Sequence, residues 1–318
     1  MTTENADIAR PAVACRCCGS RQATLVGKRY GNFLKRDFDF WHCAACDYVF
    51  VDPFPGYGVY SEDYYSGTGP DPYVDYESES RDYGSTDRIA EFDDFWRLAT
   101  GFMEASLPAG DVRWLDFGCG AGGFMKFLRD RARHRSAGRS WTIQVCGHDV
   151  GTYADRLSRE EGFSILGFDE LAAQPDGRYE VISLIEVVEH LEYPDLVFAL
   201  AARLLKPGGL LLVTTGNIAS FVARQKGLDY AYMIPEIHVG YFTPGALEAI
   251  YRRHGLVPVR FRYGGAVRFK VIKTLRSAAS KRFARIALRL PFAVRLIDAL
   301  YGTSKMPCAT KPRPRGVG

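Results

Sequence analysis

The chain has 318 residues, of which 47% are hydrophobic and 25% charged, enough for one α/β domain with an appendage or for two domains. These values exclude a collagen-like, coiled-coil or wholly disordered chain and a small disulfide-stapled scaffold. No apolar run reaches the ~18 residues that a membrane span needs. Residues 1–10 carry two acids and no apolar stretch. Because they do not resemble a secretory signal, we expect a cytoplasmic protein.

The net charge of +4 is unevenly distributed along the chain. Residues 266–318 hold 13 Lys and Arg and one acid, Asp298, whereas the remaining residues hold 28 bases and 36 acids. Only the C-terminal region is therefore expected to attract phosphate or anionic lipid.

Residues 11–56 contain two C-x2-C pairs, which predict a zinc ribbon. In a chain without an export signal this spacing is typical of structural zinc, because four thiolates satisfy tetrahedral Zn2+. Gly19 favours Cys18 over Cys17 as a ligand, since a knuckle turn there suits a residue that tolerates positive φ. Buried thiols, redox cysteines and His42 as a substitute ligand are the alternatives. The predicted ligands are Cys15, Cys18, Cys43 and Cys46.

Residues 57–84 form a polar segment with seven tyrosines among acids, glycines and prolines. The segment is too polar to build a core of its own. Two interpretations stay open: a lid whose phenols close over a ligand, or a linker packed on the main domain.

From Ser85 the pattern becomes that of an alternating α/β domain, which we place at 85–265. Apolar residues at helical spacing predict a helix over 87–106. A strand over 112–117 then runs into the glycine-rich residues 118–123, and a helix follows from Phe124. Strand, glycine loop and helix let backbone amides meet a ligand closely, because a Cβ would block the approach.

Acids follow the predicted strands at positions that suit a nucleoside ligand. Asp116 precedes the glycine loop, where a carboxylate would repel a pyrophosphate but accept an ammonium. Asp149 follows the strand over 141–146, where a carboxylate can take both ribose hydroxyls. Glu186 to His190 follow the strand over 179–185, and a helix and another strand come next. This repeating βα order predicts a Rossmann-like parallel sheet.

Residues 85–265 resemble a class I S-adenosylmethionine-dependent methyltransferase. The run from Leu115 to Gly120 is similar to the first motif of that family, Asp149 to its ribose acid, and 186–190 to its motif after the fourth strand. The resemblance implies S-adenosylmethionine as cofactor, with an adenine contact near 167–169. The residues that it assigns to the cofactor are Asp116, Gly118, Gly120, Asp149 and Glu186.

The cysteine pairs and the tyrosine segment extend the resemblance to a subgroup of sugar C-methyltransferases and polysaccharide-tailoring methyltransferases. In the sugar enzymes a tyrosine and an adjacent Glu-His pair approach the substrate. Here Tyr232, Glu236 and His238 are the corresponding catalytic candidates, but Ile237 separates the acid from the histidine. The departure leaves both C- and O-methylation open. The implied acceptor is a small molecule such as a sugar nucleotide, a glycan or a related metabolite.

Methyl transfer from a sulfonium needs alignment and, for many acceptors, a base. We expect His238 to be that base or a substrate ligand, with a structural role as the alternative. For His190 a cap or packing role is favoured. Thr243 is predicted to cap a helix that begins with Pro244.

Residues 266–318 form a basic region in which apolar residues and arginines alternate at helical spacing, and Pro291 should divide it into two helices. One interpretation is a peripheral contact of 267–301 with anionic membrane. The other, favoured, is a helical insertion before a last strand at 306–311 that completes the sheet. The two are compatible, and residues 311–315 are expected to be disordered.

Two other function classes are less favoured. A nucleic-acid methyltransferase would use the zinc segment and basic tail as a grip, but the acidic body would repel phosphate. A non-catalytic scaffold with the cofactor fold conflicts with the intact glycine loop and both acids. The sequence leaves the oligomeric state undetermined.

Overall fold

A computed structural model describes residues 13–66, 68, 76–86, 88–151, 153–261, 278–287, 290–302 and 306–313. Tyr73 and residues 314–318, which include the last two residues of the expected disordered tail 311–315, lie outside the described residues. Lys311, placed by the sequence in that tail, donates to the carbonyl oxygens of Ala202 and Leu205, each at 2.8 Å.

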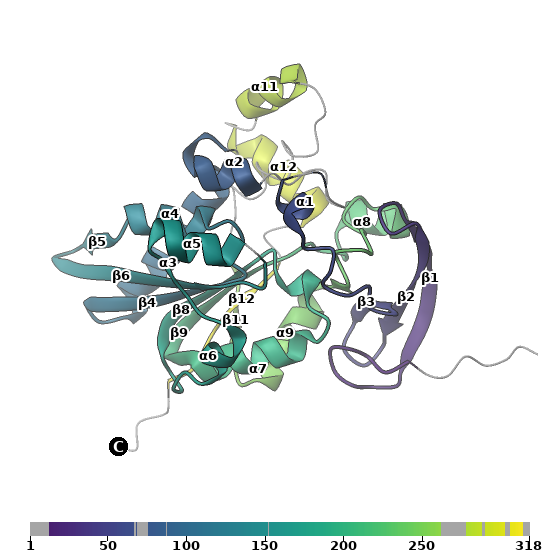
Figure 1. The fold of residues 1–318 in the computed structure, drawn as a ribbon, viewed down its shortest axis with the longest axis horizontal. Helices are drawn as coiled ribbons and strands as arrows, with labels where there is room; N and C mark the ends of the chain where they lie inside the picture. Colours follow the sequence, from purple (N-terminus) through teal and green to yellow (C-terminus); the bar gives the residue numbers. More distant parts are fainter. Residues whose placement is uncertain are drawn as a thin grey trace, which may run out of the picture.

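The main sheet has the strand order β11-β12-β9-β8-β4-β6-β5, with β7 also paired to β6 (Figure 1). Strands β4, β6, β8 and β9 run parallel, whereas β12 lies antiparallel between β9 and β11. This is the predicted Rossmann-like sheet, and β12 is the last strand expected within 306–311. The strands are β4 Gly110–Phe117, β5 Arg133–Ser136, β6 Arg139–His148, β7 Ser164–Ile165, β8 Tyr179–Ile185, β9 Leu205–Thr214, β11 Val257–Val259 and β12 Cys308–Thr310.

Helices cover both faces of this sheet, because its strands bury alternate residues on each side. Trp114 and Leu212 pack with α3 and α4, whereas Leu115 and Val213 pack with α7 and α9. Figure 1 shows α3, α4 and α5 on one side of the sheet and α6, α7 and α9 on the other. These helices are α3 Ile89–Ser106, α4 Gly123–Asp130, α5 Tyr153–Glu161, α6 Phe168–Ala172, α7 Pro194–Leu204 and α9 Pro244–Arg253.

The cysteine-bearing segment forms a second sheet of order β1-β2-β3-β10, from β1 Ala23–Gly31, β2 Arg36–Cys43, β3 Tyr48–Asp52 and β10 Gly240–Tyr241. Its fourth strand, β10, comes from the main domain and pairs antiparallel with β3. Gly240 is required there, because a Cβ would lie 1.9 Å from the Tyr48 hydroxyl oxygen. The ribbon is therefore joined to the main domain through backbone hydrogen bonds.

The basic region holds two helices, α11 Ala278–Ala287 and α12 Pro291–Tyr301, between β11 and β12. Pro291 is at the first turn of α12, so it divides the region as predicted. No helix in the described part of the chain is long and apolar enough to cross a membrane. The remaining elements are α1 Glu62–Tyr65, α2 Tyr76–Arg81, η1 Tyr83–Ser85, η2 Val188–His190, α8 Phe221–Lys226 and η3 Gly227–Asp229.

The predicted cap of α9 also connects the two sheets. Thr243 Oγ1 accepts a hydrogen bond from the Ala246 amide at 3.0 Å and donates to Asp47 Oδ2 at 2.7 Å. We expect Thr243→Ala to lower the free energy of unfolding by about 1–2 kcal/mol, measured by denaturant titration. Thr243→Ser should retain most of the stability. Equal losses in both variants would assign the effect to the methyl group and not to the hydroxyl.

Candidate functional site

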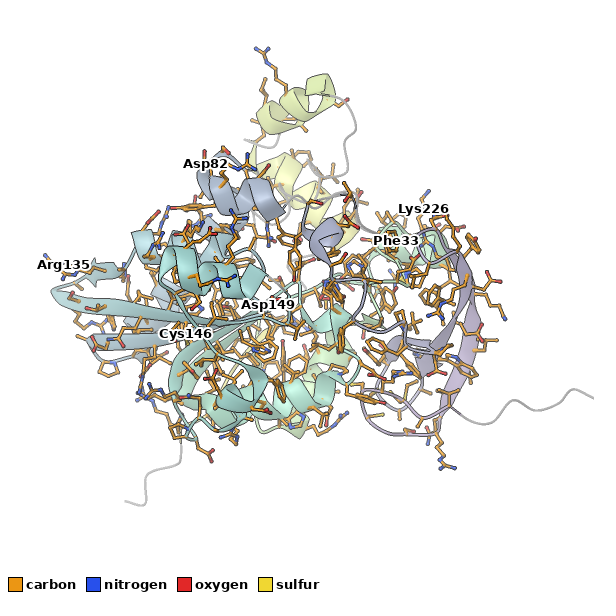
Figure 2. All side chains as sticks on the ribbon, viewed as in Figure 1. Phe33, Asp82, Arg135, Cys146, Asp149 and Lys226 are labelled. Carbon is orange, nitrogen blue, oxygen red and sulfur yellow. The ribbon has the colours of Figure 1, made fainter. Side chains whose placement is uncertain are left out.

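A cavity of about 410 Å³ opens at the carboxyl ends of β4, β6 and β8. The order of the strands reverses between β4 and β8, and such a switch point is where open α/β sheets bind ligands. Figure 2 shows Asp149 in the middle of the molecule, at this end of the strands. The predicted cofactor residues that line the cavity are Asp116, Gly118, Gly120, Asp149 and Glu186.

The glycine loop has the conformation that its sequence suggests. Gly118 has φ 79°, and a Cβ on it would lie 2.4 Å from a methyl group of Val187. Asp116 is buried, and its carboxylate accepts a 2.6 Å hydrogen bond from the Ser183 hydroxyl. The loop thus approaches the cavity with bare backbone beside a fixed carboxylate.

Asp149 is held by hydrogen bonds from three directions. Its carboxylate accepts from the amides of Gly120 at 2.8 Å and Gly151 at 2.7 Å, and from the Tyr65 hydroxyl at 3.1 Å. Burial, followed by the negative charge of Asp149, raises the pKa of Tyr65 well above its usual value. Tyr65 therefore remains a neutral donor to Asp149.

The tyrosine segment forms one wall of the cavity. Tyr60 and Tyr64 meet edge to face with ring centroids 4.9 Å apart, and Tyr64 meets Tyr65 in the same way at 5.3 Å. Gly151 must lack a side chain, because a Cβ would lie 1.8 Å from the Tyr65 hydroxyl oxygen. The segment thus packs on the main domain beside the cavity, an arrangement that both the lid and the linker interpretation allow. The tyrosines that line the cavity are Tyr57, Tyr60, Tyr64, Tyr65 and Tyr76.

Beside the cavity, Glu189, His190 and His238 each place one possible ligand atom within 4.8 Å of the others. Glu189 is 0% exposed. Among the described residues no group meets hydrogen-bond geometry at its carboxyl oxygens. Burial, and next the neighbouring Glu186, raise the pKa of Glu189 to about 8, although the Tyr232 and Thr215 hydroxyls lie close enough to lower it slightly. Such a group can be satisfied by a proton or by a cation.

Both histidines of this cluster are oriented by backbone carbonyl groups. Nδ1 of His238 is 2.6 Å from the Tyr232 carbonyl oxygen, and Nδ1 of His190 is 3.0 Å from that of Ile237. Because a carbonyl oxygen only accepts, Nδ1 of His238 carries the proton and its Nε2 has the lone pair. His190 has the same tautomer when the Tyr60 hydroxyl donates to the Ile237 carbonyl oxygen, 3.1 Å away, and accepts from Nδ1. The cluster offers two imidazoles and one carboxylate, a donor set that suits a divalent transition metal.

The other catalytic candidates do not line the cavity. The Tyr232 hydroxyl accepts from the Gly216 amide at 2.8 Å, and a Cβ on Gly216 would lie 2.3 Å from the Tyr232 ring. Glu236 is buried, and its Oε1 accepts from the amides of Phe33 at 2.8 Å and Leu34 at 3.3 Å. Tyr232 thus contacts the end of β9, and Glu236 holds the β1–β2 turn.

His238 does not line the cavity, and its ring centroid is 4.9 Å from that of His190. His190 lines the cavity, and its Nδ1 is also 2.8 Å from the Tyr60 hydroxyl. The sequence favoured a cap or packing role for His190 and did not group it with His238. The adjacent Glu189 and His190, just after the cofactor candidate Glu186, were the available signal.

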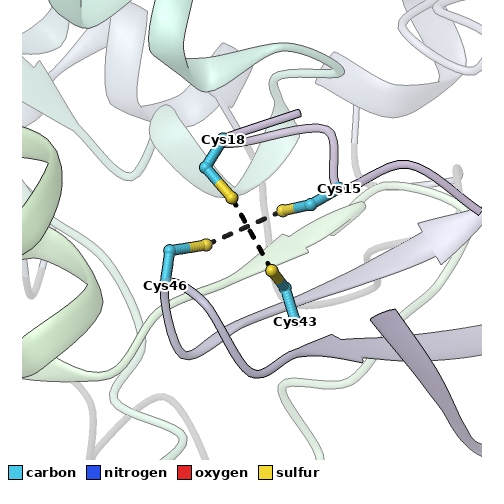
Figure 3. Close-up of side chains that lie close together, drawn as sticks. All are labelled: Cys15, Cys18, Cys43 and Cys46. Atoms are coloured by element: carbon cyan, nitrogen blue, oxygen red, sulfur yellow. Dashed lines mark hydrogen bonds between the residues drawn. The ribbon is translucent and has the colours of Figure 1, made fainter. Parts of the chain in front are cut away.

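The four predicted zinc ligands converge in the ribbon (Figure 3). Sγ of Cys15 is 3.7 Å from that of Cys46, and Sγ of Cys18 is 3.6 Å from that of Cys43. Tetrahedral Zn2+ with Zn–S bonds of about 2.3 Å requires sulfur separations of about 3.8 Å. The alternative ligand His42 instead places Nε2 3.0 Å from Asp47 Oδ1.

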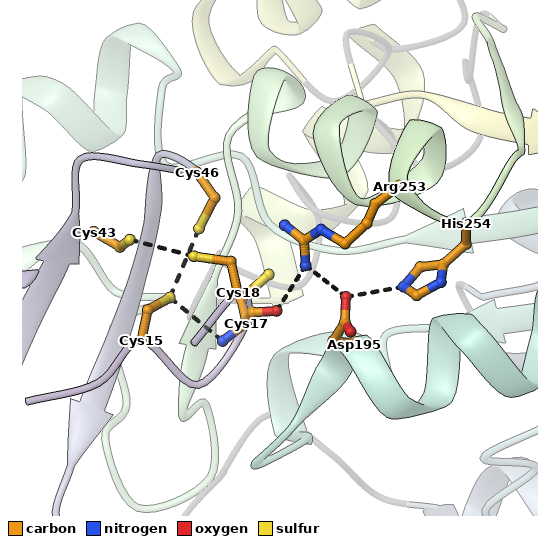
Figure 4. A network of polar contacts seen from close by, with 8 residues as sticks. All are labelled: Cys15, Cys17, Cys18, Cys43, Cys46, Asp195, Arg253 and His254. Carbon is orange, nitrogen blue, oxygen red and sulfur yellow. Dashed lines mark hydrogen bonds and ion pairs between the residues drawn. The ribbon is translucent and has the colours of Figure 1, made fainter. Parts of the chain in front are cut away.

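The first knuckle is also fixed to the main domain (Figure 4). Arg253 donates to the Cys17 carbonyl oxygen at 2.9 Å and to Asp195 at 2.6 Å, and His254 Nε2 lies 2.9 Å from Asp195. Residues of α7 and α9 thus support the first knuckle in addition to the pairing of β10 with β3.

Comparison with known proteins identifies relatives of the main domain. Residues 87–260 match a family model described as a methyltransferase domain. The ubiquinone biosynthesis O-methyltransferase of Burkholderia pseudomallei (strain 1710b) is 30% identical over 180 residues, which are 52% of this chain and 72% of the relative. The protein of the same name from Burkholderia cenocepacia is 32% identical over 147 residues, 43% of this chain and 59% of the relative.

The chain is also similar to solved structures. One is a SAM dependent methyltransferase from Archaeoglobus fulgidus, with a TM-score of 0.44 and 17% identity. The alignment covers 74% of this chain and 99% of that chain. Another is a mycolic acid cyclopropane synthase complexed with SAH and CTAB, with a TM-score of 0.42 and 18% identity. The alignment covers 70% of this chain and 84% of that chain.

If Asp149 receives the cofactor ribose, Asp149→Ala should weaken the binding of S-adenosylhomocysteine. Loss of charge-assisted hydrogen bonds of about 1.5–3 kcal/mol corresponds to roughly a 10- to 150-fold higher Kd, measured by isothermal titration calorimetry. Asp111→Ala is the matched control, because Asp111 is exposed at the start of the neighbouring strand β4, at the opposite end of the strands from the cavity. Unchanged binding to Asp149→Ala would exclude the ribose role.

Proposed function

Because the chain belongs to the class I S-adenosylmethionine-dependent methyltransferases, we propose that it methylates a hydroxyl oxygen of a small-molecule acceptor. The observation that carries this proposal is the cluster of Glu189, His190 and His238 beside the cofactor cavity. The cluster supplies the means to deprotonate a hydroxyl next to the donor methyl group.

The cluster fits a divalent cation better than it fits a lone base. A buried carboxyl group with no hydrogen-bond partner among the described residues faces two imidazoles, each with Nδ1 at a carbonyl oxygen. A divalent cation bound by Glu189, His190 and His238 would lower the pKa of an acceptor hydroxyl. Because His190 lines the cavity, a cation bound to it would hold the acceptor hydroxyl near the cofactor.

The chain's own residues supply the remaining requirements of an in-line transfer. Asp116, Asp149 and the glycine loop would fix the cofactor, while the tyrosine wall excludes water from the cavity. Polyhydroxylated acceptors such as sugar nucleotides, glycans and related metabolites fit this chemistry. Phenolic acceptors fit it as well, and the relatives' name, ubiquinone biosynthesis O-methyltransferase, supports O- over C-methylation.

A second candidate mechanism uses a histidine as the base without a cation. The Nε2 lone pair of His190 or His238 would then accept the hydroxyl proton directly. In this mechanism Glu189 would stay protonated, in keeping with its raised pKa.

The cation can be tested without knowledge of the acceptor. We expect the wild-type protein to bind Mn2+ in a titration followed by electron paramagnetic resonance, and Glu189→Gln and His238→Asn to lose that binding. His134→Asn is the control, because His134 lies on β5, where it hydrogen-bonds Glu104 of α3, and does not line the cavity. Turnover of hydroxyl acceptors, measured as S-adenosylhomocysteine release, should fall at least about 100-fold in both site variants.

Each alternative gives a different pattern in this experiment. Turnover that survives chelation but not the histidine substitutions would support the histidine base and exclude the cation. Mn2+ binding that is equal in all variants would place the cation elsewhere. Methylation of carbon in the isolated product would overturn the proposed acceptor atom.

We also propose that the four cysteines hold a structural Zn2+ that stabilises the ribbon. Cys18→Ser should abolish zinc, measured by inductively coupled plasma mass spectrometry, and lower the melting temperature, because binding energy at such sites is folding energy. Cys17→Ser is the matched control, since Cys17 is buried in the same knuckle but lies outside the group of four. Zinc loss in Cys17→Ser with retention in Cys18→Ser would reverse the ligand assignment.

A further inference from the structure

Helices α11 and α12 expose a set of large apolar side chains. Phe292 is 77% exposed and Leu296 53%. Single exposed apolar residues are ordinary, but a group of them on neighbouring elements marks an interaction surface. The group consists of Ile286, Leu290, Phe292, Leu296 and Leu300.

The apolar residues of α12 form one stripe on its outer side. Phe292, Leu296 and Leu300 are four residues apart, which places them along one face of a helix. The other side of α12 is half-buried at Val294 and Ile297. It contacts α8, and the Asn217 amide donates to the Gly302 carbonyl oxygen at 2.9 Å. The helix is thus fixed to the body with its stripe outward.

The same segment is strongly basic, whereas the rest of the chain up to it is acidic. Residues 266–301 contain nine Lys and Arg and one acid, Asp298, whereas residues 1–265 hold 28 bases and 36 acids. Arg282 and Arg295 are exposed on the two helices. Figure 1 shows α11 projecting from the molecule beyond α12, on the side away from α6, α7 and α9.

We propose that α11 and α12 form a peripheral docking surface for an anionic lipid bilayer. The helices have 10 and 11 residues, too short for the ~20 residues of a span. They suit the interface, where the apolar stripe enters the acyl boundary and the basic residues contact the headgroups. A nucleic acid would leave the stripe without a role, and a second copy of the chain would bring two strongly positive segments together.

The test is co-sedimentation of the full chain with vesicles of zwitterionic phospholipid and with vesicles that also contain anionic phospholipid. We expect the wild type to bind the anionic vesicles at least tenfold more tightly, and binding to weaken as salt is raised. Phe292→Ser with Leu296→Ser should reduce anionic-vesicle binding at least tenfold. Unchanged melting temperature and S-adenosylhomocysteine binding show that this variant is folded.

A matched double variant controls for the loss of exposed apolar area. Leu25 and Val26 are 42% and 52% exposed on β1, in the ribbon, and Leu25→Ser with Val26→Ser should bind vesicles as the wild type does. Equal binding to zwitterionic and anionic vesicles, or an equal loss in both double variants, would overturn the proposal. So would a wild-type dimer in light scattering that Phe292→Ser with Leu296→Ser converts to a monomer, or binding to RNA without binding to vesicles.

Discussion

The backbone of Val239 joins the two halves of the molecule, and the site depends on this connection. Its carbonyl oxygen accepts from the Val51 amide of the ribbon at 2.9 Å, and its amide donates to the Glu189 carbonyl oxygen at 2.8 Å. His238 is the preceding residue, so its place beside His190 is set by hydrogen bonds on both sides. Hydrogen bonds therefore connect the ribbon, the β10 strand and the two histidines. Glu236 adds a further connection, because its carboxylate accepts from the β1–β2 turn.

These connections hold Glu186 and Glu189 in an arrangement that by itself lowers the stability of the fold. Glu186 has a left-handed backbone, φ 53°, which is strained for a residue with a Cβ. Glu189 is fully buried, and the nearby Glu186 opposes its ionisation. Two carboxyl groups and two imidazoles at the end of β8 add nothing to the apolar core. The surrounding packing must offset their cost, as expected of residues retained for binding or chemistry.

The parts of the site that the sequence predicted are those encoded by neighbouring residues. The glycine loop, Asp149 and the cysteine pairs are short motifs whose chemistry depends on local spacing. The grouping of His190 with His238 depends instead on a two-residue strand, Gly240–Tyr241, that pairs with residues of the ribbon nearly two hundred positions earlier. So short a strand has no periodicity to detect. Glu236 was predicted to be catalytic from the family resemblance, and its hydrogen bonds from backbone amides of the ribbon, about two hundred positions earlier, have no local sequence signal.

The tyrosine wall connects the cofactor end of the cavity with the histidine cluster. At one end the Tyr65 hydroxyl donates to Asp149, so it occupies the carboxylate that a ribose would need. At the other end the Tyr60 hydroxyl meets Nδ1 of His190. Tyr64 contacts both rings, so the three tyrosines form a continuous packed contact from Asp149 to His190. A ribose that displaced Tyr65 from Asp149 would remove a packing partner of Tyr64, the ring that also packs on Tyr60.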